Sequence, residues 1–124
     1  MSAIVDAARG CIGARFRPQG RDPAYGLDCV GLAGVAFARG DLPKDYALRG
    51  GDAGRIAALV EGLGLRRVED AAAGDLLMLR TGPKQFHLAV MTESGFVHAD
   101  ARLRRVVETP GAPPWPVIGT WREG

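Results

Sequence analysis

The chain is poor in the residues that most often carry chemistry, with two cysteines and two histidines among 124 residues. Its 16 basic and 14 acidic side chains leave a net charge of +2, too small to predict nucleic-acid binding. No hydrophobic run approaches the ~18 residues of a membrane-spanning helix, so no membrane span is expected. The first ten residues include Asp6 and Arg9 and lack the apolar core of a signal peptide. Synthesis in the cytoplasm without a signal peptide is therefore expected.

Length and patterning predict a single α+β domain covering residues 1–124, a size at which one hydrophobic core can hold a fold. Capping side chains and helical spacing predict helices over 2–13, 28–40 and 52–64. The segment 16–26, with two prolines and two glycines, predicts an ordered loop. Six short strand-like runs follow, at 65–69, 75–81, 86–92, 95–100, 103–109 and 116–123. Helices before strands favour an antiparallel meander of about five or six strands, with the helices packed on one face.

The two cysteines have different settings, and we interpret them as separate thiols. Cys11 lies on the apolar stripe of the first predicted helix, which is typical of a buried and inert cysteine. Cys29 follows Asp28 at the predicted start of the second helix. There the helix dipole and the unpaired amide groups favour a thiolate, and the same amides suit an oxyanion. Position alone leaves a structural role for Cys29 open.

Both histidines fall in neighbouring predicted strands, so the loop between the strands decides whether they meet. A loop of two residues (Glu93 and Ser94) or of four places Ala89 opposite His98, and both histidines then share one face as diagonal neighbours. A loop of three residues would separate them. On one face, His87 would serve as a base and His98 would orient it. The alternative is a pair of half-buried structural histidines.

Four ordered segments carry a family resemblance: GLDCVGL, AAAGDLLML, FHLAVM and GFVHAD. Over residues 7–107 the chain resembles the NlpC family of bacterial cell-wall cysteine endopeptidases, which are papain-like peptidoglycan hydrolases. The resemblance implies a cysteine-bearing helix packed on an antiparallel sheet that bears the histidines. It implies Cys29 as the nucleophile, His87 as the general base and His98 as the orienting residue. The implied substrate is an amide bond in a peptidoglycan stem peptide, often between D-glutamate and a diamino acid.

Within that resemblance, the expected substrate-binding residues are Asp28, Val30 and Phe16. Two of them depart from the family pattern. Many members have a tyrosine where this chain has Phe16, and its hydroxyl helps to hold the oxyanion; loss of one such donor can cost on the order of 10² to 10³ in rate. Many also have serine where this chain has Val30. Tyr25 is close in sequence to the missing tyrosine, but the sequence does not show that it substitutes.

The compact chain is similar to the family versions found in phage tails and gene-transfer particles. This likeness predicts tail proteins as possible partners and action in the periplasm or cell wall after delivery by a particle. The main alternative is a structural component of such an assembly that keeps the fold with weak catalysis. A zinc site of Cys29, His87 and His98 is a further alternative, although no CxxC or HExxH spacing supports it. No cofactor is expected.

Overall fold

Three helices begin where the sequence predicts. The computed structural model describes residues 2–40, 42 and 51–124, and its helices are α1 (Ala3–Arg9), α2 (Cys29–Ala36) and α3 (Ala53–Gly62). Side chains of the preceding residues Ser2, Asp28 and Asp52 each accept a hydrogen bond from a first-turn amide, as N-caps do. All three helices end earlier than predicted, α1 at Arg9 and α2 at Ala36. In these described ranges, no helix has the length and apolar character needed to cross a membrane.

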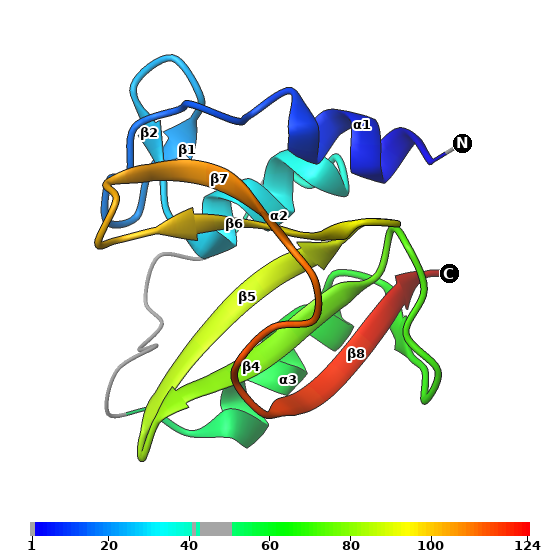
Figure 1. Ribbon diagram of the computed structural model, residues 1–124. Coiled ribbons are helices and arrows are strands. Elements are labelled where there is room, and N and C mark those ends of the chain that lie inside the picture. The colour runs from blue at the N-terminus through cyan, green and yellow to red at the C-terminus, as the bar shows by residue number, and fades with distance from the viewer. Residues whose placement is uncertain (1, 41, 43–50) are drawn as a thin grey trace.

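Six strands form one antiparallel sheet in the order β3-β8-β4-β5-β6-β7. Their bounds are β3 (Leu65–Arg67), β4 (Leu76–Gly82), β5 (Gln85–Met91), β6 (Gly95–Asp100), β7 (Arg105–Pro110) and β8 (Val117–Glu123). Strands β4 to β7 follow one another as the predicted meander. The prediction is wrong for β8, which returns to lie between β3 and β4. Figure 1 shows it beside β4. In that place β8 pairs the backbone groups of β4 that would otherwise form an open sheet edge.

The segment predicted as an ordered loop contains a small hairpin. Strands β1 (Arg21–Asp22) and β2 (Gly26–Leu27) pair with each other and stand apart from the main sheet. Two-residue strands give too little alternation to be recognised in a sequence rich in proline and glycine. The hairpin matters because it leads directly into Asp28 and α2.

The helices cover one face of the sheet, which confirms the predicted α+β architecture (Figure 1). Strand residues of that face share one hydrophobic cluster with the three helices, and include Leu76, Met78, Leu88, Val90, Val97 and Ala99. The other face carries a smaller cluster of Leu77, Leu79, Ala89 and Phe96, against which Met91 and Trp115 pack. Alternation along the strands therefore divides the chain's apolar side chains into a large core and a small one.

Strands β5 and β6 pair only near the turn that joins them. Val90 lies opposite Val97 and Met91 opposite Phe96, and the amide of Thr92 donates to the carbonyl of Gly95 (2.9 Å) across a two-residue turn. This is the register predicted for an even loop. Beyond these pairs the two strands diverge (Figure 1), and α2 contacts both of them. The start of α2 thus lies at a break in the sheet rather than over an intact surface.

Candidate active site

Asp28 fixes the start of α2. One oxygen of its carboxylate accepts from the amide of Gly31 (2.8 Å) and from Nη1 of Arg21 (3.1 Å). The other accepts from the amide of Gln19 (2.9 Å). The N-cap therefore ties the first turn of α2 to the loop that precedes it, and so holds Cys29 in place. Because its oxygens serve this purpose, Asp28 has a positioning role in addition to its place on the cavity wall.

Cys29 is more buried than the sequence suggests. Its side chain is 3% exposed and packs with the main hydrophobic cluster. Burial raises the pKa of the Cys29 thiol to about 12, and the nearby charge of Asp28 acts in the same direction. The backbone amides of Leu88, Cys29 and Val30 oppose the rise. The expected lowering of this pKa by the helix start is thus outweighed, and the resting residue is a neutral thiol.

His87 and His98 form a direct hydrogen-bonded pair. Nε2 of His87 lies 2.9 Å from Nδ1 of His98, and the two rings meet edge to face with centroids 5.1 Å apart. The other ring nitrogen of His98, Nε2, lies 3.2 Å from the hydroxyl oxygen of Thr109 on β7. The chain of contacts His87, His98, Thr109 therefore crosses three strands. Nδ1 is the ring nitrogen of His87 that remains for contact with a substrate or a thiol.

Both histidines are held neutral. Burial lowers the pKa of His87 to about 4, and the neighbouring His98 adds to that effect. Burial also lowers the pKa of His98. Asp100 opposes both changes without reversing them. At neutral pH each ring therefore carries one proton, so the position of that proton decides whether His87 can act as a base.

Trp115 covers the histidine pair, and sequence reasoning missed it. Its ring centroid lies 6.1 Å from the centroids of both His87 and His98 and 6.3 Å from that of Phe96. Trp115 belongs to the proline-rich stretch GAPPWP, between β7 and β8. The available signal in the sequence for a role of Trp115 at the site was a single aromatic residue in a rigid, proline-rich loop. Its indole shields the imidazoles from water, in agreement with their lowered pKa values.

One cavity of about 480 Å³ brings these side chains together. Its lining residues are Phe16, Pro18, Gln19, Asp28, Cys29, Thr81, Gln85, Phe86, His87, His98, Ala99, Asp100, Ala101, Arg102 and Trp115. Two of the three expected substrate-binding residues, Phe16 and Asp28, are among them. Val30 is not, because it is buried in the main core. Tyr25 is 70% exposed and also lies outside this lining, so its hydroxyl does not replace the one absent at Phe16.

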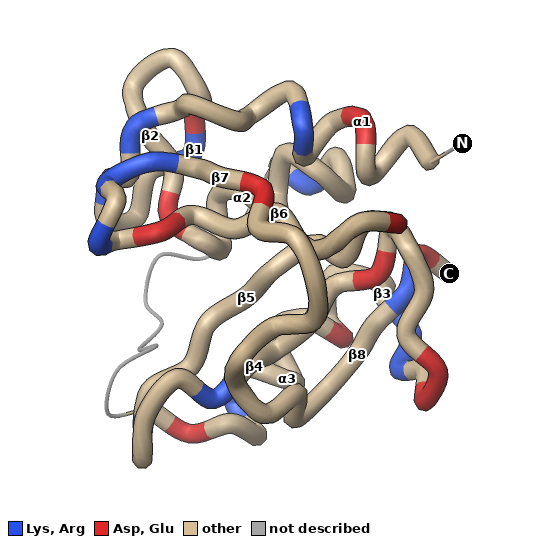
Figure 2. The backbone as a smooth tube through the Cα atoms, in the orientation of Figure 1, with Lys and Arg blue, Asp and Glu red and all other residues tan. Residues whose placement is uncertain are grey.

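The charged residues of the cavity lining are Asp28, Asp100 and Arg102. The amide of Arg102 donates to the Asp100 carboxylate (2.8 Å). Figure 2 shows basic residues gathered at the turn between β6 and β7.

Across the residues that the structure describes, no three His, Cys, Asp or Glu side chains are placed to hold a metal ion. The zinc alternative therefore has no support from the geometry.

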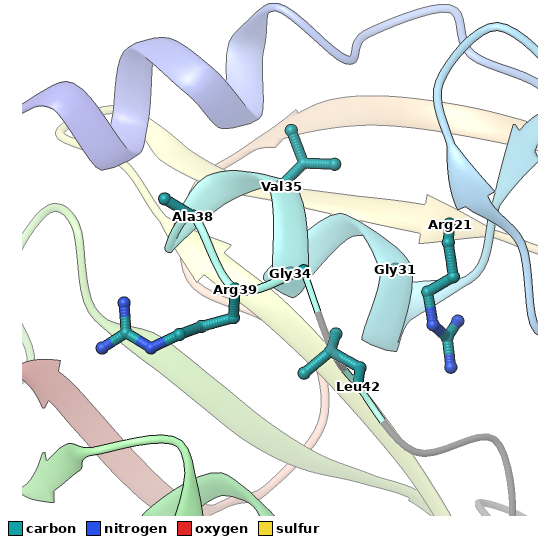
Figure 3. A pocket seen from close by; sticks show the side chains of 8 residues that line it. Arg21, Gly31, Gly34, Val35, Ala38, Arg39 and Leu42 are labelled. Atoms are coloured by element: carbon teal, nitrogen blue, oxygen red, sulfur yellow. The ribbon is translucent and has the colours of Figure 1, made fainter.

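A second cavity, of about 210 Å³, lies along α2 but contains no nucleophile or base (Figure 3). Leu42 lies across its middle, and Arg21 and Arg39 lie at its two ends. Arg39 is engaged in the fold: its guanidinium donates to the carbonyl oxygens of Leu63 (2.7 Å) and Phe37 (2.6 Å) and pairs with Glu123 (2.6 Å). The larger cavity is therefore the candidate active site.

Comparison with solved structures finds the same fold in a domain of a peptidoglycan hydrolase. The crystal structure of the NlpC/p60 domain of the peptidoglycan hydrolase SagA matches with a TM-score of 0.55 and 24% sequence identity, over 87% of this chain and 86% of that one. The chain matches no protein-family model and no curated protein sequence. The likeness establishes a papain-like NlpC/p60 fold, and at this identity it establishes the fold alone.

Proposed function

We propose that this chain is a cysteine hydrolase that cleaves amide bonds in peptidoglycan stem peptides. The observation that carries the proposal is the convergence of Cys29, His87 and His98 on one cavity, with the cysteine at a helix start and the histidines in hydrogen-bonded contact. The fold shared with the NlpC/p60 domain of a peptidoglycan hydrolase supports the choice of substrate. The sequence segments around all three residues support it independently. The bond type, between D-glutamate and a diamino acid, is the finer part of the proposal.

In the proposed reaction, the sulfur of Cys29 attacks the carbonyl carbon of the substrate amide while His87 takes the thiol proton. Because burial favours the neutral form of both resting groups, the thiol proton has to pass to His87 for the sulfur to act as a nucleophile. The carbonyl π electrons move to oxygen, and the candidate donors to that oxygen are the backbone amides that act on the sulfur, those of Leu88 on β5 and of Cys29 and Val30 at the start of α2. Collapse of the intermediate breaks the C–N bond, and His87 returns the proton to the leaving amine.

The second half of the reaction releases the acid product. A water molecule gives a proton to His87 and attacks the thioester carbon, the C–S bond breaks, and the thiolate of Cys29 recovers the proton. His98 keeps the His87 ring oriented throughout. Delivery to the cell wall by a phage-like particle, with tail proteins as partners, stays a prediction from the sequence resemblance.

Release of new amino groups from purified peptidoglycan tests the proposal. The wild-type chain should release them, and Cys29→Ala should not. Cys11→Ala is the matched control, because it removes a buried thiol that lies outside the cavity. Equal release by wild type and Cys29→Ala would refute the assignment of the nucleophile. No release by any of the three folded proteins would favour a structural role for the fold.

A further inference from the structure

Thr109 occupies a defined place beside the histidine pair. It lies on β7 opposite Phe96, so strand alternation puts its side chain on the sheet face that carries Phe96 and His98. Its hydroxyl oxygen is 3.2 Å from Nε2 of His98. Threonine is β-branched and therefore stiff at χ1, which keeps the hydroxyl in one position. The residue thus forms a rigid end to the chain of contacts that starts at His87.

The hydrogen-bond chain has two possible directions, and only one suits a base. If the Thr109 hydroxyl accepts from Nε2–H of His98, then Nδ1 of His98 has a lone pair and accepts from Nε2–H of His87. Nδ1 of His87 is then unprotonated and can receive a proton. In the reverse direction the hydroxyl donates to His98, and His87 carries its proton on Nδ1. That tautomer cannot take the thiol proton at this nitrogen.

We infer that Thr109 is a positioning residue for His87: its hydroxyl oxygen accepts from Nε2–H of His98 and so sets the tautomers of both imidazoles. The inference rests on the proposed function, because it supposes that His87 acts as a base. Thr109 itself does not touch the substrate cavity, since it is absent from the cavity lining. It acts through His98, as a second hydrogen-bonding partner acts on a ligand or base.

Two substitutions at this position separate the hydroxyl from the shape of the side chain. Thr109→Val keeps the β-branched shape and removes the hydroxyl, whereas Thr109→Ser keeps the hydroxyl. The matched control is Thr120→Val, a buried threonine on β8, two strands away from His87. All three variants should keep the wild-type circular dichroism spectrum.

Nitrogen-15 NMR of the two imidazoles gives a readout that does not depend on activity. In wild type we expect both rings as the Nε2–H tautomer, and in Thr109→Val a mixture of tautomers at His98 and His87. Thr109→Ser and Thr120→Val should keep the wild-type pattern. Unchanged tautomers in Thr109→Val, or an Nδ1–H tautomer at His87 in wild type, would overturn the inference.

Peptidoglycan cleavage provides the second readout. Thr109→Val should lower kcat by about tenfold, the effect of one lost hydrogen bond of ordinary strength, with KM unchanged and Thr109→Ser close to wild type. A kcat that does not fall although the tautomers change would also overturn the positioning role. If wild type cleaves nothing, the proposed function fails, and the NMR pattern alone still decides whether Thr109 sets the tautomers.

Discussion

The carbonyl oxygen of Gly20 lies against Gly31, in the space that a β-carbon at Gly31 would fill. Gly31 is in the first turn of α2, two residues after Cys29, and its amide donates to the Asp28 carboxylate. The loop before the hairpin therefore packs directly on the helix start. A glycine at this position lets Asp28, Gln19 and Cys29 come together at one end of the cavity.

Gly31→Ala should lower the free energy of unfolding by about 2 kcal/mol, because backbone would have to move to admit the methyl group. It should also lower the proposed activity, since the displaced loop carries Gln19 on the cavity wall. The matched control is Gly62→Ala, at the end of α3, where a β-carbon meets nothing within 4 Å. That variant should be neutral or slightly more stable. Denaturant unfolding of both variants measures the difference, and equal stabilities would contradict the packing argument.

Local features of this site were predictable from the sequence. The N-cap at Asp28 follows from a side chain and an amide three residues apart, and strand alternation puts the two histidines on one face for a loop of even length, which the two-residue turn at Glu93 and Ser94 is. Both depend on contacts between residues close in sequence, which patterns of capping and alternation describe well.

The remaining features depend on contacts between distant parts of the chain. Trp115 reaches the histidines because the chain before β8 crosses from the β7 edge of the sheet to the place between β3 and β4. The burial of Cys29 depends on the divergence of β5 from β6, which lets α2 approach both strands. The periodicity of one segment predicts neither the order of strands in a sheet nor the point at which two strands stop pairing. The backbone amides at the start of α2 do lower the pKa of Cys29, but burial, which no local pattern predicts, raises it by more.

The high pKa of the Cys29 thiol predicts slow alkylation of the resting protein. With a pKa of about 12, the thiolate fraction at neutral pH is on the order of 10³ lower than that of a free cysteine. In Cys11→Ala, where Cys29 is the remaining thiol, iodoacetamide should react correspondingly more slowly with the folded than with the unfolded protein. The rate should rise about tenfold per pH unit between pH 7 and 9. A folded protein that reacts as fast as the unfolded one would show a thiolate and contradict the burial argument.

The lowered pKa of His87 predicts an active base in mildly acidic solution. The acid limb of kcat/KM for peptidoglycan cleavage should fall near pH 4, well below the ordinary histidine value of about 6.5. Titration of the His87 ring by NMR gives the same quantity without a substrate. A midpoint near pH 6.5 in both measurements would mean that the ring is better hydrated than its place under Trp115 indicates.

The same pKa sets how stability depends on pH. Above pH 6.5 the His87 ring is neutral in both the folded and the unfolded chain, so it adds no pH dependence. Between pH 6.5 and pH 4 the His87 ring binds a proton in the unfolded chain but not in the folded chain. The free energy of unfolding therefore falls by up to about 3 kcal/mol. His87→Gln should lose that part of the decline. Urea unfolding at pH 7.5 and pH 4.5 measures it, and parallel declines in the two proteins would exclude His87 as its source.

Glu108 gives a second stability prediction, which concerns a charged carboxylate rather than a neutral histidine. Its carboxylate accepts two hydrogen bonds from the Arg9 guanidinium, both 2.9 Å, and one each from the hydroxyls of Thr92 (2.8 Å) and Ser94 (3.1 Å). These contacts lower the pKa of Glu108 to about 2. They join α1 to β7 and to the turn before β6. Glu108→Gln removes the charge and should lower the free energy of unfolding at pH 7 by about 1 to 2 kcal/mol, after allowance for its partial exposure.

The difference between wild type and Glu108→Gln separates this ion pair from general acid unfolding, which lowers the stability of both proteins. A carboxylate with a lowered pKa stabilises the fold above its unfolded value of about 4.3, and the contribution disappears as the pH falls toward 2. The stability difference between wild type and Glu108→Gln should therefore shrink over that range. Glu93→Gln is the control: Glu93 also pairs with Arg9 but is 63% exposed, so its loss should change stability little. A difference that stays constant from pH 7 to pH 2.5 would show that the Glu108 charge does not stabilise the fold.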